Sequence, residues 1–130
     1  FKGTWRYAAP ELVLDKEVPS KAADVYALAL TVCCCFDLAY PYPDVAGLYP
    51  SDCIDAVRQQ LPVAPDSASP HLRALLNQCL HRQPEKRPTA VELLHAIESL
   101  MVRCFGATPS VLPSCQMFCC VCCCFVAFEF

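Results

Sequence analysis

Apolar residues recur at helical spacing through most of the chain up to Met101, and no stretch of any length alternates as a β-strand would. Proline-rich loops and a polar turn separate the periodic segments. The pattern predicts a mainly α fold, a single helical lobe without internal repeats. Helices are expected over residues 10–14, 22–38, 51–60, 70–80 and 90–106.

Capping residues mark where several of these helices begin. Pro10 and Glu11 suit the first turn of the first helix. Ser20 is expected to cap the second helix, and Thr89 the last, with Glu92 completing a capping-box spacing. The core-facing stripe of the last helix is expected to consist of Val91, Leu94, Ile97 and Met101, widened by Leu93 and Leu100.

The second predicted helix is apolar on almost every face, which is typical of a helix buried in a core or a membrane. Asp24 and Asp37 bracket its apolar stretch, which falls well short of the ~20 residues that cross a bilayer. We therefore expect a central core helix.

The composition suits one small domain of 130 residues, and the net charge of -3 argues against a nucleic-acid partner. The chain begins with Phe1 and not with Met, so we expect a fragment of a longer protein or a partial gene model. Its many cysteines, read as free thiols in a reducing compartment, favour a cytoplasmic protein.

The chain has 12 cysteines, most of them in two runs, 33–35 and 119–124. Adjacent cysteines make poor disulfide partners, and we expect free thiols that act as small buried apolar side chains. Cys119 and Cys122 have the spacing of a zinc ligand pair, but a second pair at suitable spacing is lacking, so no metal is expected.

Residues 105–130 form a Cys- and Phe-rich hydrophobic tail that is expected to lie outside the domain. Three interpretations stay open for it. Clustered thiols beside an apolar run suit palmitoylation or membrane association. A short hydrophobic anchor is the second interpretation, and out-of-frame sequence without function is the third.

Three motifs occur in order: residues 3–11 (GTWRYAAPE), 21–29 (KAADVYALA) and 79–89 (CLHRQPEKRPT). They resemble the end of the activation segment, the start of the central helix and the turn before the last helix of eukaryotic protein kinases. A Pro-Tyr-Pro loop at 41–43 also matches. The resemblance implies that residues 1–104 are a C-terminal lobe of the kinase fold. Gly3-Thr4 favours serine/threonine specificity, and Cys79 with Arg-Pro-Thr favours the tyrosine-kinase-like branch.

The resemblance also assigns roles to single residues. Thr4, Trp5, Arg6 and Tyr7 would form the loop that receives the substrate residue after the phosphoacceptor. Thr4 resembles the threonine whose hydroxyl bonds the catalytic aspartate and lysine, and Tyr7 is expected to pack on the core.

Glu11 and Arg87 correspond to residues that the family pairs in a buried, structural ion pair. Asp24 corresponds to a buried carboxylate that holds the backbone of the catalytic loop. Thr31 and Cys35 occupy positions that support the adenine-binding hydrophobic column.

Several residues depart from the family pattern and indicate a diverged kinase. Ala29 replaces a glycine of the central helix, Leu80 a tryptophan, and Gln83 the Asp before proline. Cys34 stands where a Glu often occurs.

The Gly-rich loop, strand lysine, His-Arg-Asp loop and Asp-Phe-Gly metal site of a kinase do not occur in this sequence. The three glycines are too scattered to cradle phosphate, so no cofactor is expected to bind this fragment. The intact protein would use ATP and Mg²⁺ to phosphorylate protein serine or threonine.

The fragment itself would supply substrate docking and scaffold. One alternative is a pseudokinase or docking module, in which residues 51–60 and 40–49 bind a regulatory protein. Another is a truncated product without function.

Overall fold

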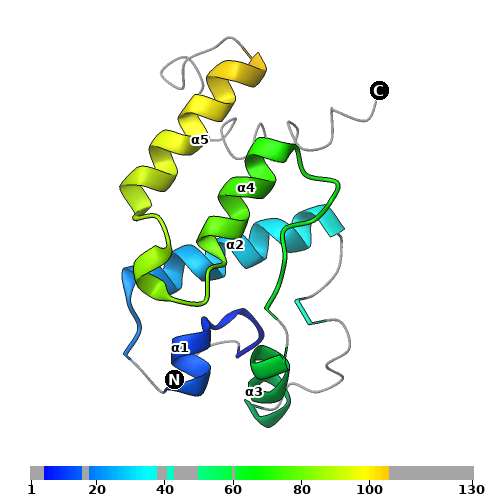
Figure 1. Ribbon diagram of the computed structural model, residues 1–130, viewed down its shortest axis with the longest axis vertical. Helices are drawn as coiled ribbons and strands as arrows, with labels where there is room; N and C mark the ends of the chain where they lie inside the picture. The colour runs from blue at the N-terminus through cyan, green and yellow to red at the C-terminus, as the bar shows by residue number, and fades with distance from the viewer. Residues whose placement is uncertain (1–4, 16–17, 38–40, 43–49, 60, 106–130) are drawn as a thin grey trace.

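The computed structural model describes residues 5–15, 18–37, 41–42, 50–59 and 61–105. Every regular element within these ranges is helical, which confirms the predicted mainly α class (Figure 1). Each predicted helix is present, with boundaries within one or two residues of those expected. In chain order the elements are η1 (Trp5–Tyr7), α1 (Pro10–Leu14), α2 (Lys21–Asp37), α3 (Pro50–Gln59), α4 (Pro70–Cys79), η2 (Pro84–Lys86) and α5 (Ala90–Phe105).

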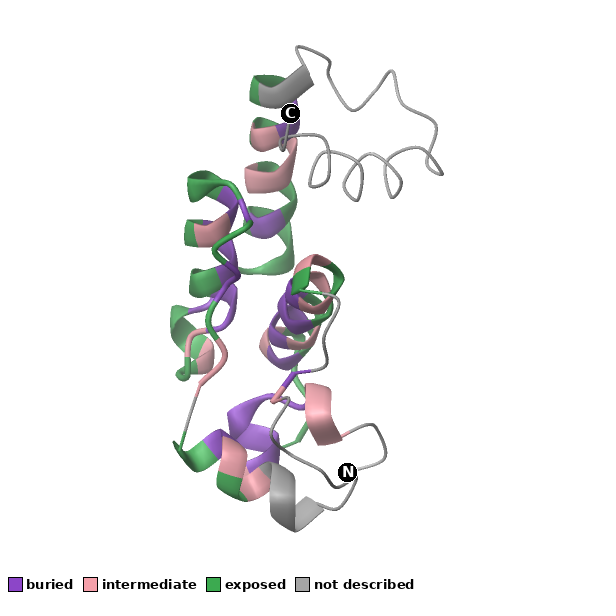
Figure 2. Ribbon diagram, turned by 90° about the vertical axis from the view of Figure 1, so that its right-hand side faces the viewer, coloured by how far each residue is buried: buried purple, intermediate pink, exposed green. Residues whose placement is uncertain are grey.

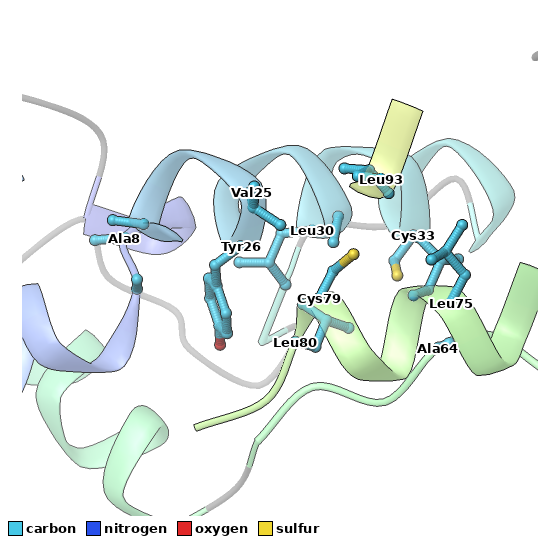
Figure 3. Close-up of a cluster of buried hydrophobic side chains, with 14 of the residues drawn as sticks. Ala8, Val25, Tyr26, Leu30, Cys33, Ala64, Leu75, Cys79, Leu80 and Leu93 are labelled. Carbon is cyan, nitrogen blue, oxygen red and sulfur yellow. The ribbon is translucent and has the colours of Figure 1, made fainter. Parts of the chain in front are cut away.

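Helix α2 crosses the middle of the molecule, and the other elements gather on two sides of it (Figure 1). α1 and α3 pack together at one end with η1, while α4 and α5 pack together at the other. Figure 3 shows side chains from α2, among them Leu30 and Cys33, facing Leu75 and Cys79 of α4. Burying one apolar side chain of this kind stabilises a fold by roughly 1.5–3 kcal/mol. The packing of α2 against α4 therefore contributes substantially to the stability of the core.

One stripe of α2 remains uncovered by the described residues, contrary to the expectation of a helix buried on every face. Lys21, Asp24, Leu28, Thr31 and Cys35 are all exposed, and they recur every three or four residues. Leu28 is 47% exposed. The apolar content predicted burial, but the described elements pack only on the other faces of α2.

The helix caps follow the sequence closely. The amide of Ala23 donates to Ser20 Oγ at 3.2 Å, at the start of α2. Before α5, the Thr89 amide donates to Glu92 Oε2 at 2.8 Å and the Glu92 amide donates to Thr89 Oγ1 at 3.3 Å. These reciprocal bonds are the predicted capping box. Ser69, which is not among the expected caps, caps α4 by accepting a hydrogen bond from the Leu72 amide at 3.4 Å.

The buried face of α5 differs from the predicted stripe. Val91 and Leu94 are 62% and 46% exposed, whereas Leu93 is buried. α5 contacts α4 and α2 along one side only, and Figure 2 shows its outer side exposed. The spacing correctly predicted an amphipathic helix. It wrongly predicted that Val91 and Leu94 lie on the buried face. The side chains that pack on the core are those of Leu93, Ala96, Ile97 and Leu100, with Met101 also buried.

Candidate functional site

A buried ion pair joins α1 to the turn before α5. Arg87 Nη1 and Nη2 each donate to one carboxylate oxygen of Glu11, both at 2.7 Å. The side chains of Arg87 and Glu11 are 0% and 5% exposed, although the residues lie 76 positions apart in the chain. The two parallel bonds match the planar fork of a guanidinium to a carboxylate. The pair that the resemblance implied therefore exists as a bidentate, desolvated contact.

The Arg87 guanidinium donates through every one of its N–H groups. Besides the two bonds to Glu11, Nε donates to the His81 carbonyl at 2.8 Å. Nη1 also donates to the Ala22 carbonyl at 3.0 Å, and Nη2 to the Arg82 carbonyl at 3.1 Å. A buried charge is tolerated when its partners satisfy it fully. One side chain thus ties together α1, the first turn of α2 and residues 81–87.

Tyr26 lies directly beside this ion pair. The residue is 0% exposed, and the centroid of its ring lies 4.8 Å from Arg87 Cζ, within cation–π range. Its hydroxyl lies 3.3 Å from the hydroxyl of Tyr42. Burial, with a smaller contribution from Tyr42, raises the pKa of Tyr26 far above its ordinary value, so the phenol stays neutral. Tyr26 belongs to the motif at residues 21–29, but the motif does not indicate that this tyrosine contacts both Arg87 and Tyr42.

Arg6 contacts the backbone that follows α2. Its Nη1 donates to the Pro41 carbonyl at 3.0 Å and to the Tyr42 carbonyl at 3.2 Å. Tyr42 has φ 54°, in the left-handed region that residues with a Cβ rarely adopt. The family resemblance predicts Arg6 among the residues that receive substrate, and it indicates neither this contact nor the conformation of Tyr42. The only sequence feature that points to an unusual backbone at this place is that Tyr42 lies between two prolines, Pro41 and Pro43.

The other residues of the expected substrate loop lie against the core. Trp5 and Tyr7 are half-buried and form η1 together with Arg6. Burial raises the pKa of the Cys34 thiol, and a side-chain hydrogen bond with Tyr7 partly offsets this. Thr4 lies outside the described residues. The structure therefore brings three of the four loop residues onto α2 and the segment that follows it.

Asp24 lies in the first turn of α2, as expected, but it is exposed and not buried. The family resemblance implies burial beneath a catalytic loop, and no described element covers this side of the helix, so the assignment of Asp24 as an anchor of that loop stays a prediction. Leu28, Thr31 and Cys35 are exposed on the same stripe. Asp24 thus differs from Glu11, which is buried.

Cys33, Cys34, Cys35 and Cys79 are free thiols, and Cys33 and Cys79 are buried as expected. Burial raises the pKa of Cys33 to about 12 and that of Cys79 to about 11. Since the thiolate is the nucleophile, both thiols should react poorly at neutral pH. Cys34 is half-buried and Cys35 exposed.

Within the described ranges, no group of His, Cys, Asp and Glu side chains has the arrangement of a metal site. None of the helices seen there is both long and apolar enough to span a membrane. The Cys119–Cys122 pair and the tail from residue 106 lie outside the described residues.

Comparison with known proteins agrees with these features. The family model for the protein kinase domain matches residues 1–97. Serine/threonine-protein kinase 12 of Arabidopsis thaliana is 33% identical over 97 residues, which cover 74% of this chain and 21% of the relative. Mitogen-activated protein kinase kinase kinase 3 of the same plant is 36% identical over 96 residues (72% and 17%).

Dual specificity protein kinase shkE of Dictyostelium discoideum is 31% identical over 103 residues, which cover 77% of this chain and 14% of the relative. The chain thus spans about a fifth or less of the length of these relatives. The matched segment contains η1, the Glu11–Arg87 ion pair and the capping box of α5. This chain belongs to the protein kinase domain family.

Proposed function

We propose that this chain is the C-terminal helical part of a kinase domain in a longer protein that phosphorylates serine or threonine residues of proteins. Within that domain, the chain supplies the loop that docks the substrate and the scaffold that supports it. The observation that carries the proposal is the Glu11–Arg87 ion pair, because it fixes the end of the expected substrate loop to the helical core.

The substrate loop comprises Thr4 to Tyr7 in this proposal. Its described part, η1, packs on α2 through Trp5 and Tyr7, and Ala8 and Ala9 behind it are buried. A docking loop has to keep its geometry before substrate arrives, because ordering it on binding would weaken affinity. The burial of residues 8–13 and the ion pair at Glu11 provide that rigidity.

The uncovered stripe of α2 is the face on which we place the rest of the kinase domain. Asp24 would hold the backbone of the catalytic loop, and Thr31 and Cys35 would lie beneath the adenine-binding column. These residues, together with Leu28, form one exposed line along the helix. An exposed leucine within such a line suits a surface that another part of the domain covers.

ATP and Mg²⁺ are assigned to the intact protein and not to this chain. ATP supplies the phosphoryl group and Mg²⁺ neutralises its developing charge. The three glycines, Gly3, Gly47 and Gly106, are too far apart in sequence to form a phosphate cradle. We therefore propose no ATP-contacting residue here, and this chain's own contribution is to position the substrate.

Finer assignments are also part of the proposal. The tyrosine-kinase-like branch rests on Cys79 and the Arg87-Pro88-Thr89 sequence alone. The names of the relatives support serine/threonine kinases in general, mitogen-activated protein kinase kinase kinases among them. We place the protein in the cytoplasm, with a protein substrate and a regulatory protein as partners.

A docking module without catalysis is the second candidate. Thr31 and Cys35 favour it, because both are smaller and more polar than the Leu or Met expected beneath an adenine column. Ala29 and Leu80, two departures from the family pattern, are both buried, so they change the core and not only the surface.

The test is phosphoryl transfer by the full-length protein. Purified protein with Mg²⁺ and radiolabelled ATP is offered degenerate peptide libraries that contain serine and threonine or only tyrosine as acceptor. We expect label in the serine/threonine library. A folded full-length protein that labels neither library would contradict the kinase proposal and favour the docking module, and label confined to tyrosine would contradict the specificity.

A further inference from the structure

One guanidinium attaches the expected substrate loop to the segment that follows α2. Arg6 Nη1 bridges the carbonyl oxygens of Pro41 and Tyr42, at 3.0 and 3.2 Å. These residues lie 35 and 36 positions further along the chain, and Pro41 is buried. The contact is therefore a partly buried tertiary contact, and Arg6 makes it with backbone atoms.

Tyr42 is held in a conformation that it would not favour by itself. Its φ of 54° places it in the left-handed region. Such a backbone persists where its surroundings determine it from several directions. Here Arg6 binds its carbonyl, and its hydroxyl lies 3.3 Å from that of Tyr26. Tyr42 is thus fixed at both its backbone and its side chain.

Tyr26 connects this contact with the ion pair. Its hydroxyl faces Tyr42, and its ring lies beside the guanidinium of Arg87, which binds Glu11. The short segment from Arg6 to Glu11 is consequently attached at both ends. Arg6 binds Tyr42, Glu11 binds Arg87, and both of these partners contact the buried Tyr26. Between these ends, the Ala8 amide donates to the Trp5 carbonyl at 3.0 Å and closes η1.

We propose that Arg6 is a positioning residue for the substrate loop. By binding the carbonyls of Pro41 and Tyr42, it sets how close η1 lies to the segment after α2, and so fixes the surface that a substrate meets. Arg6 acts through this backbone contact and not by pairing with a substrate side chain. The inference rests on the proposed docking function of residues 4–7.

The experiment uses the full-length protein with Arg6→Ala, the milder Arg6→Lys, and Arg103→Ala as a control that removes an exposed arginine of α5. Hydrogen exchange of the Ala8 amide reports the loop directly. Loss of the bonds to the Pro41 and Tyr42 carbonyls should accelerate this exchange by about 10-fold in Arg6→Ala. Arg6→Lys should lie between Arg6→Ala and wild type, because an ammonium group retains donors for the carbonyls. Exchange in α5 should stay unchanged in both.

The kinetic readout separates positioning from general damage. With a peptide selected from the degenerate serine/threonine library, Arg6→Ala should raise the peptide KM several-fold and leave the KM for ATP unchanged. Unchanged exchange at Ala8 overturns the inference, and so does faster exchange with an unaltered peptide KM. If the full-length protein transfers no phosphate, the proposed function fails, whereas the exchange at Ala8 still decides whether Arg6 positions the loop.

Discussion

Arg87 and Glu11 form a bidentate ion pair across 76 residues of sequence, and the same guanidinium also donates to the carbonyls of Ala22, His81 and Arg82. The pair is thus the centre of a larger polar contact and not an isolated salt bridge. Through it, α1, the short helix after the proposed substrate loop, is attached to the core helix α2 and to the turn before α5.

Replacing Arg87 should destabilise the domain severely. Arg87→Ala leaves a buried carboxylate without its partner, at a cost of about 3–5 kcal/mol. Arg87→Lys keeps the charge but loses the fork that binds both Glu11 oxygens, so it should also destabilise. Thermal unfolding of the full-length protein measures both. Arg82→Ala is the matched control, because its side chain is exposed and only its carbonyl serves the site. Equal unfolding temperatures for Arg87→Ala and Arg82→Ala would contradict the assigned role.

The Tyr26–Tyr42 contact should appear as a coupling free energy between the two hydroxyls. Tyr26→Phe and Tyr42→Phe each delete one partner, and a neutral hydrogen bond contributes about 0.5–1.5 kcal/mol. A double-mutant cycle on the free energy of unfolding isolates the pair. We expect a coupling within that range. Strictly additive effects would mean that the 3.3 Å approach contributes no stability.

The capping box of α5 should weaken in acid. Hydrogen bonds from the Thr89 amide and hydroxyl hold the pKa of Glu92 below its ordinary value of 4.5. Because the folded-state pKa is lowered, the stabilisation is complete above pH 4.5 and is lost as the pH falls through the folded value. The protection of amides at the start of α5, measured as the exchange rate relative to an unstructured peptide at the same pH, should therefore decrease below pH 4.5.

Glu92→Gln should abolish that dependence while keeping an acceptor for the Thr89 amide. Thr89→Ala should destabilise the helix by about 1 kcal/mol at neutral pH, as the loss of an N-cap does. Exchange in α5 that follows the same pH profile in wild type and Glu92→Gln would refute the assignment to Glu92.

Thiol labelling should test whether the α2 stripe is covered in the full-length protein. In the chain described here, iodoacetamide should modify the exposed Cys35 well before Cys33 and Cys79, whose pKa values are raised by burial. In the full-length protein we expect Cys35 to be protected as well. Cys33 and Cys79 act as internal controls, because their rapid labelling would reveal unfolding. Equally fast labelling of Cys35 in both proteins would argue against docking on this face.

The sequence predicted the helices well because its start and stop signals are local. Ser20, Thr89 and Glu92 specify helix ends through hydrogen bonds to neighbouring residues, and those bonds are present. It predicted burial less well, because burial depends on which elements pack where. Val91 and Leu94 fitted an apolar stripe, yet α5 turns Leu93 to the core. Asp24 was expected to be buried by a segment that this chain does not contain.

Some of the long-range contacts of the site could be predicted, and others could not. The Glu11–Arg87 pair was implied by a family resemblance, since nothing local links residues 76 positions apart. The contacts of Arg6 with the Pro41 and Tyr42 carbonyls, and of Tyr42 with Tyr26, join a backbone conformation to distant side chains. Residue types alone do not encode such a φ value, so these contacts could not be predicted from the sequence.

The most direct test of the account is the substrate dependence of phosphoryl transfer in Glu11→Gln. The amide removes the charge that pairs with Arg87 while keeping the size of the side chain. At a temperature at which the full-length variant remains folded, the account predicts a raised peptide KM and an unchanged KM for ATP, because only the substrate loop loses its anchor. An unchanged peptide KM in the folded, active variant would contradict the claim that this ion pair positions the substrate loop.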